Sequence, residues 1–368
     1  MKRFAALLLV FSLVLTLGGV SVTVSASDED WNAIVEAAKK EGVVVVYDTS
    51  SRMGEAAEGF TNKYSIEVQW TKMGDSEISD RVVREHEAKA RGADVMVSES
   101  AAILLGQLLS QGYVINYVPS THKDIVPVEY QNPLAYRFQP RIIGYNTEAY
   151  DEPPIKNLWE LTTPKWRGKV ALRDPQFTAM QLAWFAEIVE AADVMAAAYE
   201  KCFGEPIVLT TPNAGWEFIK RFANNKPVIF RSDGDVAEAV GARGQTDPPV
   251  GLYVLSKHRE IPAKNLALDV CYGIEPCIGY LYPAYVAITM NAASPNAAKL
   301  FVSYLLDEGV NAWTKDLGNF SPNPGIPPHP DDPLGGIEEW AKVAMPLNAQ
   351  TTVKYYAELF DFWMKHAK

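Results

Sequence analysis

Two carboxylates flank a glycine near the middle of the chain, in the tripeptide Asp233-Gly234-Asp235. They follow an apolar run ending at Phe230, which we interpret as a buried strand, and with Ser232 they precede a helix whose first turn is residues 235–238. Such a strand-to-helix turn is a frequent ligand site in α/β proteins, because the first amide groups of the helix point outward. Ser and Asp are equally common as helix caps, so the turn is either one wall of a binding site or a cap alone.

Two earlier turns carry polar side chains of the same kind. One is Thr49-Ser50-Ser51, after which a helix begins at Arg52, and the other is Ser98-Glu99-Ser100. Three hydroxyl groups beside a helix N-terminus can hold an oxyanion, and a guanidinium there adds a charged hydrogen bond. The alternative for residues 49–51 is again helix capping. We expect hydroxyls and carboxylates from successive turns to face one another across a gap.

An enzyme that hydrolyses glycosides could use Asp233 and Asp235 as its acid and base. Two carboxylates only two residues apart would instead crowd one side of a ligand. The sequence has neither a Gly-x-Ser-x-Gly elbow nor a His-Glu-x-x-His helix. No recognisable pair or motif is formed by the five histidines, which are His86, His122, His258, His329 and His366. We expect a binding protein, and the hydrolase is the less favoured alternative.

The elements that must position these turns alternate between helix and strand. Apolar residues with helical spacing over 28–40 end at Gly42, and a β-branched run, 43–47, follows. The order continues with helix 52–63, strand 66–70, helix 76–91 and strand 93–97. This alternation predicts a mostly parallel sheet with the polar turns along one edge.

A second set of elements begins with a strand at 141–147, which we interpret as a crossing between two lobes. The further predicted elements are a strand and turn at 170–175, one helical region at 178–201, helix 216–224, strand 228–230, strand 250–255, a returning strand at 280–290, helix 296–306 and closing helices within 337–368. The predicted domains are a first lobe of residues 27–138 with a return segment at 275–325, a second lobe of 139–274, and a C-terminal Pro-rich and helical segment of 326–368.

Residues 1–26 have the pattern of a cleavable export signal. Lys2 and Arg3 precede an apolar run, and Val24-Ser25-Ala26 suits a cleavage site. Removing the two basic residues leaves 32 against 45 acidic ones, so the mature chain has a net charge of −13. This charge argues against a nucleic-acid partner. We expect a periplasmic protein whose mature chain has no membrane-spanning segment.

The three cysteines are an odd number for an exported protein. Cys271 and Cys277 are close enough in sequence to close a small loop, and Cys202 would then stay free. The alternative is three buried thiols that pack as small apolar side chains. Of the two, we favour the Cys271–Cys277 disulfide.

Five blocks of residues resemble the extracellular solute-binding proteins of ABC importers, in the right order and through most of the mature chain. The blocks are Val43 to Asp48, Ala93-Asp94-Val95 with Ser98-Glu99, Tyr145-Asn146-Thr147, residues 163–170 (TPKWRGKV) and residues 294–301 (SPNAAKLF). The likeness is to the ferric-iron-binding branch and its relatives for sugar phosphates, phosphonates and polyamines. It implies a two-lobed periplasmic-binding-protein fold of type II, a ligand in the cleft between the lobes, and lobe closure recognised by the membrane subunits of the transporter. We expect a monomer without a cofactor.

The resemblance also raises the possibility of iron. Iron-binding members hold the ion with a tyrosine pair after the mid-chain strand, and often with a histidine in the first turn and a glutamate in the third. Glu99 matches the glutamate, but the first turn lacks the histidine and carries Arg52, which would repel a cation. Residues 232–235 replace the tyrosine pair, and Tyr355-Tyr356 lies in a predicted helix, where neighbouring side chains diverge. Iron held by Glu99 and tyrosines is therefore the alternative ligand.

The substituted residues favour a small organic anion such as a sugar phosphate or a phosphonate. The anionic end would lie at residues 49–52, and carboxylates of Asp233, Asp235 and Glu275 would accept hydrogen bonds from hydroxyl or amine groups. Tyr282 and Tyr285 are either platforms for the ligand or hinge packing. The predicted ligand-binding residues are Thr49, Ser50, Ser51, Arg52, Glu99, Ser100, Tyr145, Thr178, Ser232, Asp233, Gly234, Asp235, Glu275 and Tyr282.

Overall fold

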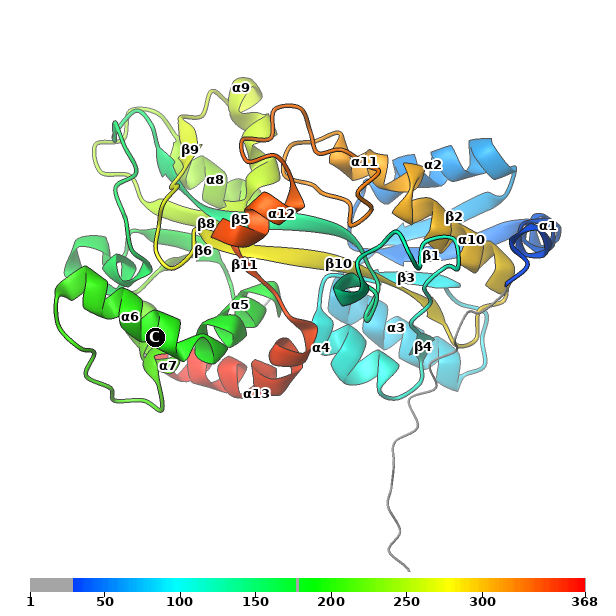
Figure 1. Ribbon diagram of the computed structural model, residues 1–368, viewed down its shortest axis with the longest axis horizontal. Helices are drawn as coiled ribbons and strands as arrows, with labels where there is room; N and C mark the ends of the chain where they lie inside the picture. Colours follow the sequence, from blue (N-terminus) through cyan, green and yellow to red (C-terminus); the bar gives the residue numbers. More distant parts are fainter. Residues whose placement is uncertain (1–28, 177–178, 368) are drawn as a thin grey trace, which may run out of the picture.

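The computed structural model describes residues 29–176 and 179–367, so the predicted export signal lies outside the described residues. Within them, eleven strands form one mixed sheet, and its main path is β2-β1-β3-β10-β5-β8-β6-β7 (Figure 1). Helices cover both faces of this sheet. The predicted α/β class is confirmed.

The first half of the sheet consists of β1 (Val43–Asp48), β2 (Glu67–Lys72) and β3 (Val95–Ser98), which are mutually parallel. The helices between them are α2 (Met53–Tyr64) and α3 (Asp75–Glu87), and α1 (Trp31–Glu41) precedes β1. Helix α1 stops at Gly42, whose φ of 72° is a left-handed conformation that glycine adopts without strain. The predicted alternation is therefore confirmed here, with boundaries shifted by a few residues.

The second half of the sheet consists of β6 (Val170–Arg173), β7 (Val228–Phe230) and β8 (Val250–Val254), with β8 and β7 parallel to β6. Two sequence predictions were wrong here. Strand β7 is not buried, because it forms the edge of the sheet and leaves Val228 and Ile229 about 40% exposed. The region after β6 contains two helices, α5 (Ala179–Glu190) and α6 (Ala192–Phe203), instead of one.

Two long antiparallel strands join the halves. They are β5 (Ala135–Asn146) and β10 (Gly279–Thr289), and they run through the middle of the molecule from one half into the other (Figure 1). β10 pairs with β3 of the first half, and β5 pairs with β8 of the second. The sequence analysis placed the start of the crossing strand at 141, six residues too late. Nearly every residue of both strands is buried.

The remaining elements support these halves. They are α4 (Ala101–Ile103), a π-helical turn (Leu104–Leu109), β4 (Val114–Ile115), α7 (Ala214–Asn224), α8 (Asp233–Gly241), α9 (Ile261–Lys264), β9 (Leu268–Val270), α10 (Pro295–Leu306), α11 (Asn311–Thr314), α12 (Ile337–Val343), β11 (Met345–Pro346) and α13 (Ala349–His366). Short 3-10 turns lie at Val128–Tyr130, Leu158–Thr162, Pro164–Trp166, Leu255–Glu260 and Glu308–Val310. None of the helices in the described residues is long and apolar enough to cross a membrane.

Helix α13 packs against both halves of the molecule. It lies along α5 and α7 of the second half and also contacts α4 of the first (Figure 1). Trp363 is buried in this interface, with its ring 5.3 Å from that of Phe185. On the side of the first half, Val353 faces Gly106.

The N-terminus of α13 gives a local stability prediction. The side-chain oxygen of the exposed Asn348 accepts hydrogen bonds from the amides of Gln350 (2.8 Å) and Thr351 (3.0 Å). Replacing Asn348 by Ala is expected to lower the free energy of unfolding by about 1 kcal/mol, because two amides lose their partner. Urea unfolding followed by circular dichroism measures this. Gln350→Ala, at an exposed neighbour that caps nothing, is the control, and an equal loss in both variants would contradict the prediction.

The predicted Cys271–Cys277 disulfide is wrong. All three cysteines are free thiols, and both Cys271 and Cys277 are buried in the core. Burial raises the pKa of the Cys277 thiol to about 11, so the thiol stays neutral and packs as a small apolar group. The alternative from the sequence analysis, buried thiols, describes these two residues.

Candidate ligand-binding site

One face of the two crossing strands carries a row of polar side chains. In β5 the residues Arg137, Gln139 and Arg141 alternate with apolar ones, so all three point to the same face. The register pairs Arg141 with Tyr280 and Gln139 with Tyr282 of β10, which places both tyrosines on that face as well. Two arginines and two tyrosines therefore form a polar floor where the halves of the molecule meet.

Each arginine of the floor is paired with a carboxylate from a different half. The guanidinium of Arg137 donates to Glu99, at the end of β3, over 3.0 Å. Arg141 donates to Asp233, at the start of α8, over 3.1 Å, and a second nitrogen lies 2.9 Å from the other carboxylate oxygen. Arg173, at the end of β6, also donates to Asp233 over 3.3 Å. We call Glu99, Arg137, Arg141, Arg173 and Asp233 the arginine–carboxylate cluster.

The cluster keeps polar atoms that have no hydrogen-bond partner among the described residues. In the cluster these buried atoms are the Nε of Arg137, Arg141 and Arg173, the Nη1 of Arg141 and one carboxylate oxygen of Asp233, and beside it they are the hydroxyls of Tyr136 and Tyr280 and one carboxylate oxygen of Asp48. The side chain of Arg141 is 0% exposed and that of Arg137 is 2% exposed. Buried polar atoms without partners are costly to folding unless something binds them, so this concentration of unpaired atoms makes the face the candidate ligand site.

The two tyrosines line the floor beside Arg141. Its guanidinium lies 5.7 Å from the ring centre of Tyr280 and 5.8 Å from that of Tyr282. The hydroxyl of Tyr282 donates to Gln139 over 2.8 Å. Burial is the main reason that the pKa of Tyr282 lies far above its ordinary value, and the nearby Glu99 adds to it. Both rings therefore remain neutral phenols at physiological pH.

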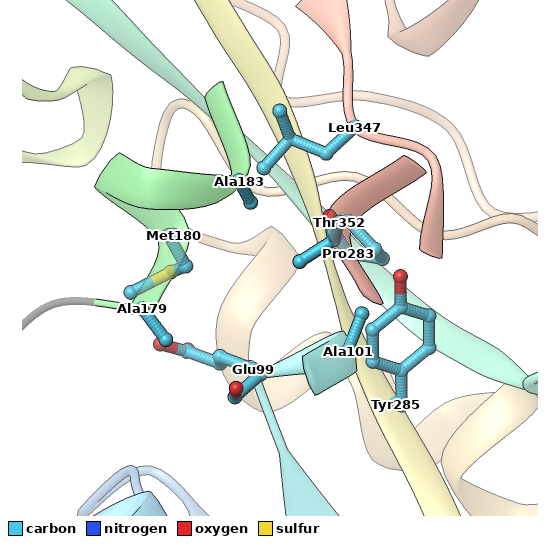
Figure 2. Close-up of a pocket in the computed structure, with 10 residues that line it drawn as sticks. Glu99, Ala101, Ala179, Met180, Ala183, Pro283, Tyr285, Leu347 and Thr352 are labelled. Carbon is cyan, nitrogen blue, oxygen red and sulfur yellow. The ribbon is translucent and has the colours of Figure 1, made fainter. Parts of the chain in front are cut away.

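A small hollow borders the cluster on the other side of β10. The residues that line it include Glu99, Ser100, Ala179, Met180, Tyr285 and Thr352 (Figure 2). Pro283 also contributes, and it lies next to Tyr282 in the strand and so points to the opposite face. Glu99 thus belongs both to the cluster and to this mostly apolar hollow between α4, α5 and α13.

The chain matches the family model described as bacterial extracellular solute-binding protein over residues 16–346. This match covers most of the chain. The protein belongs to that family. No curated protein sequence matches this chain.

Solved structures show the fold of this solute-binding protein in other members. Iron-bound HitA from Pseudomonas aeruginosa is 18% identical with a TM-score of 0.70, and the alignment covers 89% of this chain and 99% of that one. AfuA from Actinobacillus pleuropneumoniae with fructose-6-phosphate is 20% identical with a TM-score of 0.65, over 89% and 98% of the chains. The ferric binding protein from Campylobacter jejuni is 15% identical with a TM-score of 0.67, over 88% and 98%. The predicted two-lobed fold and the predicted family are confirmed.

In this solute-binding protein, several polar groups of the hydroxyl-rich turn after β1 bond to other residues of the chain. The carboxylate of Asp48 accepts the amide of Ser50 (3.0 Å), and the hydroxyl of Ser50 accepts both the amide of Arg52 (3.2 Å) and the indole of Trp313 (3.1 Å). Arg52 pairs closely with Asp316. Ser50 and Arg52 are therefore engaged by other residues of the chain, although no side chain caps the first amides of α2, and the oxyanion pocket at residues 49–52 stays a prediction. Thr49 is half-buried and Ser51 is exposed.

The predicted turn at residues 232–235 divides into a cap and a site residue. The hydroxyl of Ser232 caps α8 by accepting the amide of Asp235 over 3.1 Å. Asp235 is exposed, Gly234 is half-buried and only Asp233 reaches the cluster. Ser100 likewise caps α4, although it also lines the hollow.

Two other predicted residues are not brought to the cluster. Tyr145 lies at the far end of β5, paired with Asp269 of β9. Glu275 pairs with Lys201 of α6, on the outside of the second half. A further predicted residue, Thr178, lies outside the described residues. Glu99, Asp233 and Tyr282 are the predicted residues that the structure brings together.

The sequence analysis missed all three arginines of the cluster. A signal for two of them was present, because Arg137, Gln139 and Arg141 repeat every second residue in an otherwise apolar stretch. A strand that begins at 141 does not contain this repeat, so the late start of the predicted strand hid it. Arg173 was in a predicted turn, and only the fold shows that it reaches Asp233.

Proposed function

We propose that the protein is the periplasmic receptor of an ABC importer and that it captures a small organic anion, of the sugar-phosphate or phosphonate kind, between its lobes. The observation that carries this is the three guanidiniums of the arginine–carboxylate cluster, each with a buried N–H that no described residue accepts. Guanidinium groups form strong charged hydrogen bonds with phosphate and carboxylate oxygens. A phosphoryl group supplies enough acceptors for all three.

The carboxylates of the cluster suit the other end of such a ligand. Glu99 comes from the first half of the sheet and Asp233 from the second, so each lobe presents one acceptor. Hydroxyl or amine groups of the ligand would donate to them. A ligand held by both lobes favours the closed arrangement by its differential affinity, and the membrane subunits of the importer would recognise that arrangement. We propose a monomer that binds no nucleic acid, exported through a signal at residues 1–26.

Ferric ion is the alternative, and the related structures include iron-bound HitA as well as AfuA with fructose-6-phosphate. An iron site here would use Glu99 with Tyr280 and Tyr282. Two buried arginines beside these residues would repel a trivalent cation. Burial also raises the pKa of both tyrosines, which opposes the tyrosinate form that binds iron. A hydrolase with Asp233 and Asp235 is disfavoured, because Asp235 is exposed and Asp233 is held by two arginines.

A thermal-shift panel tests the proposal, since a ligand that binds only the folded state raises the melting temperature. The probes are fructose 6-phosphate, 2-aminoethylphosphonate, ferric citrate and spermidine. We expect stabilisation by the phosphate ester or the phosphonate, and no product after incubation. Stabilisation by ferric citrate alone, with visible tyrosinate-to-iron absorbance, would replace this proposal by the iron alternative. Mass spectrometry of ligand retained through native purification then identifies the compound.

A further inference from the structure

Asp48 is a buried carboxyl beside the cluster with one oxygen unused. It is the last residue of β1 and its side chain is completely buried. One oxygen accepts the amide of Ser50 at 3.0 Å and the hydroxyl of Thr49 at 3.4 Å. The other oxygen is buried and has no hydrogen-bond partner among the described residues. An ionised carboxylate in this setting would carry an uncompensated charge.

The groups that face Asp48 do not supply that compensation. From β5 they are Arg137 and Tyr136, and from the end of β3 the acidic Glu99. Arg137 already donates to Glu99 at 3.0 Å and to Asn319 at 3.5 Å.

The helices next to Asp48 add no free cation from the described residues. Arg52, at the start of α2, is paired with Asp316, and Trp313 of α11 contributes only its indole N–H to Ser50. Asp75 of α3 lies behind Glu99, whose amide donates to it, and adds a third acidic group. Burial raises the pKa of Asp48 to about 7, although the Ser50 amide and Arg137 act in the opposite direction.

We propose that Asp48 is the proton-carrying contact of the site: its neutral carboxyl donates a hydrogen bond from the unused oxygen to the bound anion, so binding takes up one proton from solvent. This inference rests on the proposed function, capture of an organic anion. The neutral carboxyl adds a donor to the three guanidinium N–H groups and removes a negative charge that would repel the ligand. The ionised form has neither advantage.

The proposal fixes the sign of the pH dependence. A bound anion raises the pKa of Asp48 further, because it disfavours a second negative charge nearby. Affinity is therefore constant while the free protein is protonated at Asp48. It falls as the pH rises above about 7, by up to about tenfold per pH unit for a single coupled proton.

The test is isothermal titration calorimetry of the mature protein with fructose 6-phosphate and with 2-aminoethylphosphonate, between pH 7.5 and 9. Wild type is expected to lose about tenfold in affinity per pH unit. Asp48→Asn keeps the shape and always presents an amide N–H donor, so it is expected to bind with little pH dependence. The difference in pH dependence between wild type and Asp48→Asn excludes the contribution of every other group that titrates in this range. One such group is Glu187, because burial raises its pKa to about 7.

Wild type alone provides a second measurement, which stands even if the variant does not fold. Binding enthalpies at pH 8 in buffers of different ionisation enthalpy report the protons taken up, and about one per ligand is expected, because the phosphoryl group of the probe is already a dianion at this pH. Equal pH slopes in wild type and Asp48→Asn, or no proton uptake at pH 8, would overturn the role of Asp48. Absence of binding by either probe at every pH would instead count against the proposed function.

Discussion

Replacing Asp233 by Asn is expected to lower the free energy of unfolding by about 3–5 kcal/mol, the range for breaking a buried ion pair by removing one partner. Arg141 is completely buried, and Asp233 is its carboxylate partner. The variant leaves that guanidinium without a counter-charge in the core. Arg173 also loses its contact, but it is 25% exposed and can turn to water. Denaturant unfolding of the unliganded protein measures the effect.

Two comparisons distinguish this from a general sensitivity of the turn. Asp235→Asn changes an exposed carboxylate two residues away and is expected to alter stability by less than about 0.5 kcal/mol. The double variant Arg141→Met/Asp233→Leu removes both charges and is expected to be more stable than Asp233→Asn. Equal losses for Asp233→Asn and Asp235→Asn would mean that the ion pair contributes nothing to folding.

Replacing Arg173 by Gln is expected to weaken binding of the favoured anion by about 10- to 100-fold, the usual effect of losing one charged hydrogen bond. Arg173 makes a single 3.3 Å contact with Asp233, its Nε has no partner among the described residues, and its side chain is partly exposed. It therefore serves binding more than folding. Calorimetric titration with the phosphate ester or phosphonate from the thermal-shift panel gives the dissociation constants.

Arg231→Gln is the matched control for this change. Arg231 lies in the same strand-to-helix region, is exposed, and makes no ion pair with a described residue. The same loss of charge there is expected to change affinity less than about threefold, since only screened long-range attraction is removed. If both variants weaken binding equally, the effect is one of net charge and the local role of Arg173 is refuted.

Local pattern was enough to predict most elements of the first half. The β-branched run of β1, the stop at Gly42 and the helical spacing on either side are set by near neighbours in sequence. The turns that end β3 and precede α8 could be recognised in the same way. The strands before these turns are β3 and β7, which run parallel to β1 and β6. The turns after parallel strands lie along one edge of a sheet, so Glu99 and Asp233 were among the candidates.

The floor of the site could not be obtained in this way. Arg137 and Arg141 are binding candidates only when β5 is known to cross both halves and to pair with β10. The positions of Tyr145 and Glu275 also depend on distant partners, because Tyr145 lies in the part of β5 that pairs with β9 and Glu275 pairs with Lys201 of α6. Exposure of β7 likewise depends on its place at the sheet edge, which its apolar residues do not reveal.

The packing of helix α13 on both halves offers a way to follow the proposed closure of the lobes. It is packed on α5 and α7 from one side and on α4 from the other, so the proposed closure of the lobes would move the helix relative to at least one of these surfaces. Val353 and Gly106 mark the contact on the α4 side. Paired fluorescent labels on α13 and α7, or on α13 and α3, would tell which surface slips, and would turn the chain into an optical sensor without altering a residue of the cluster.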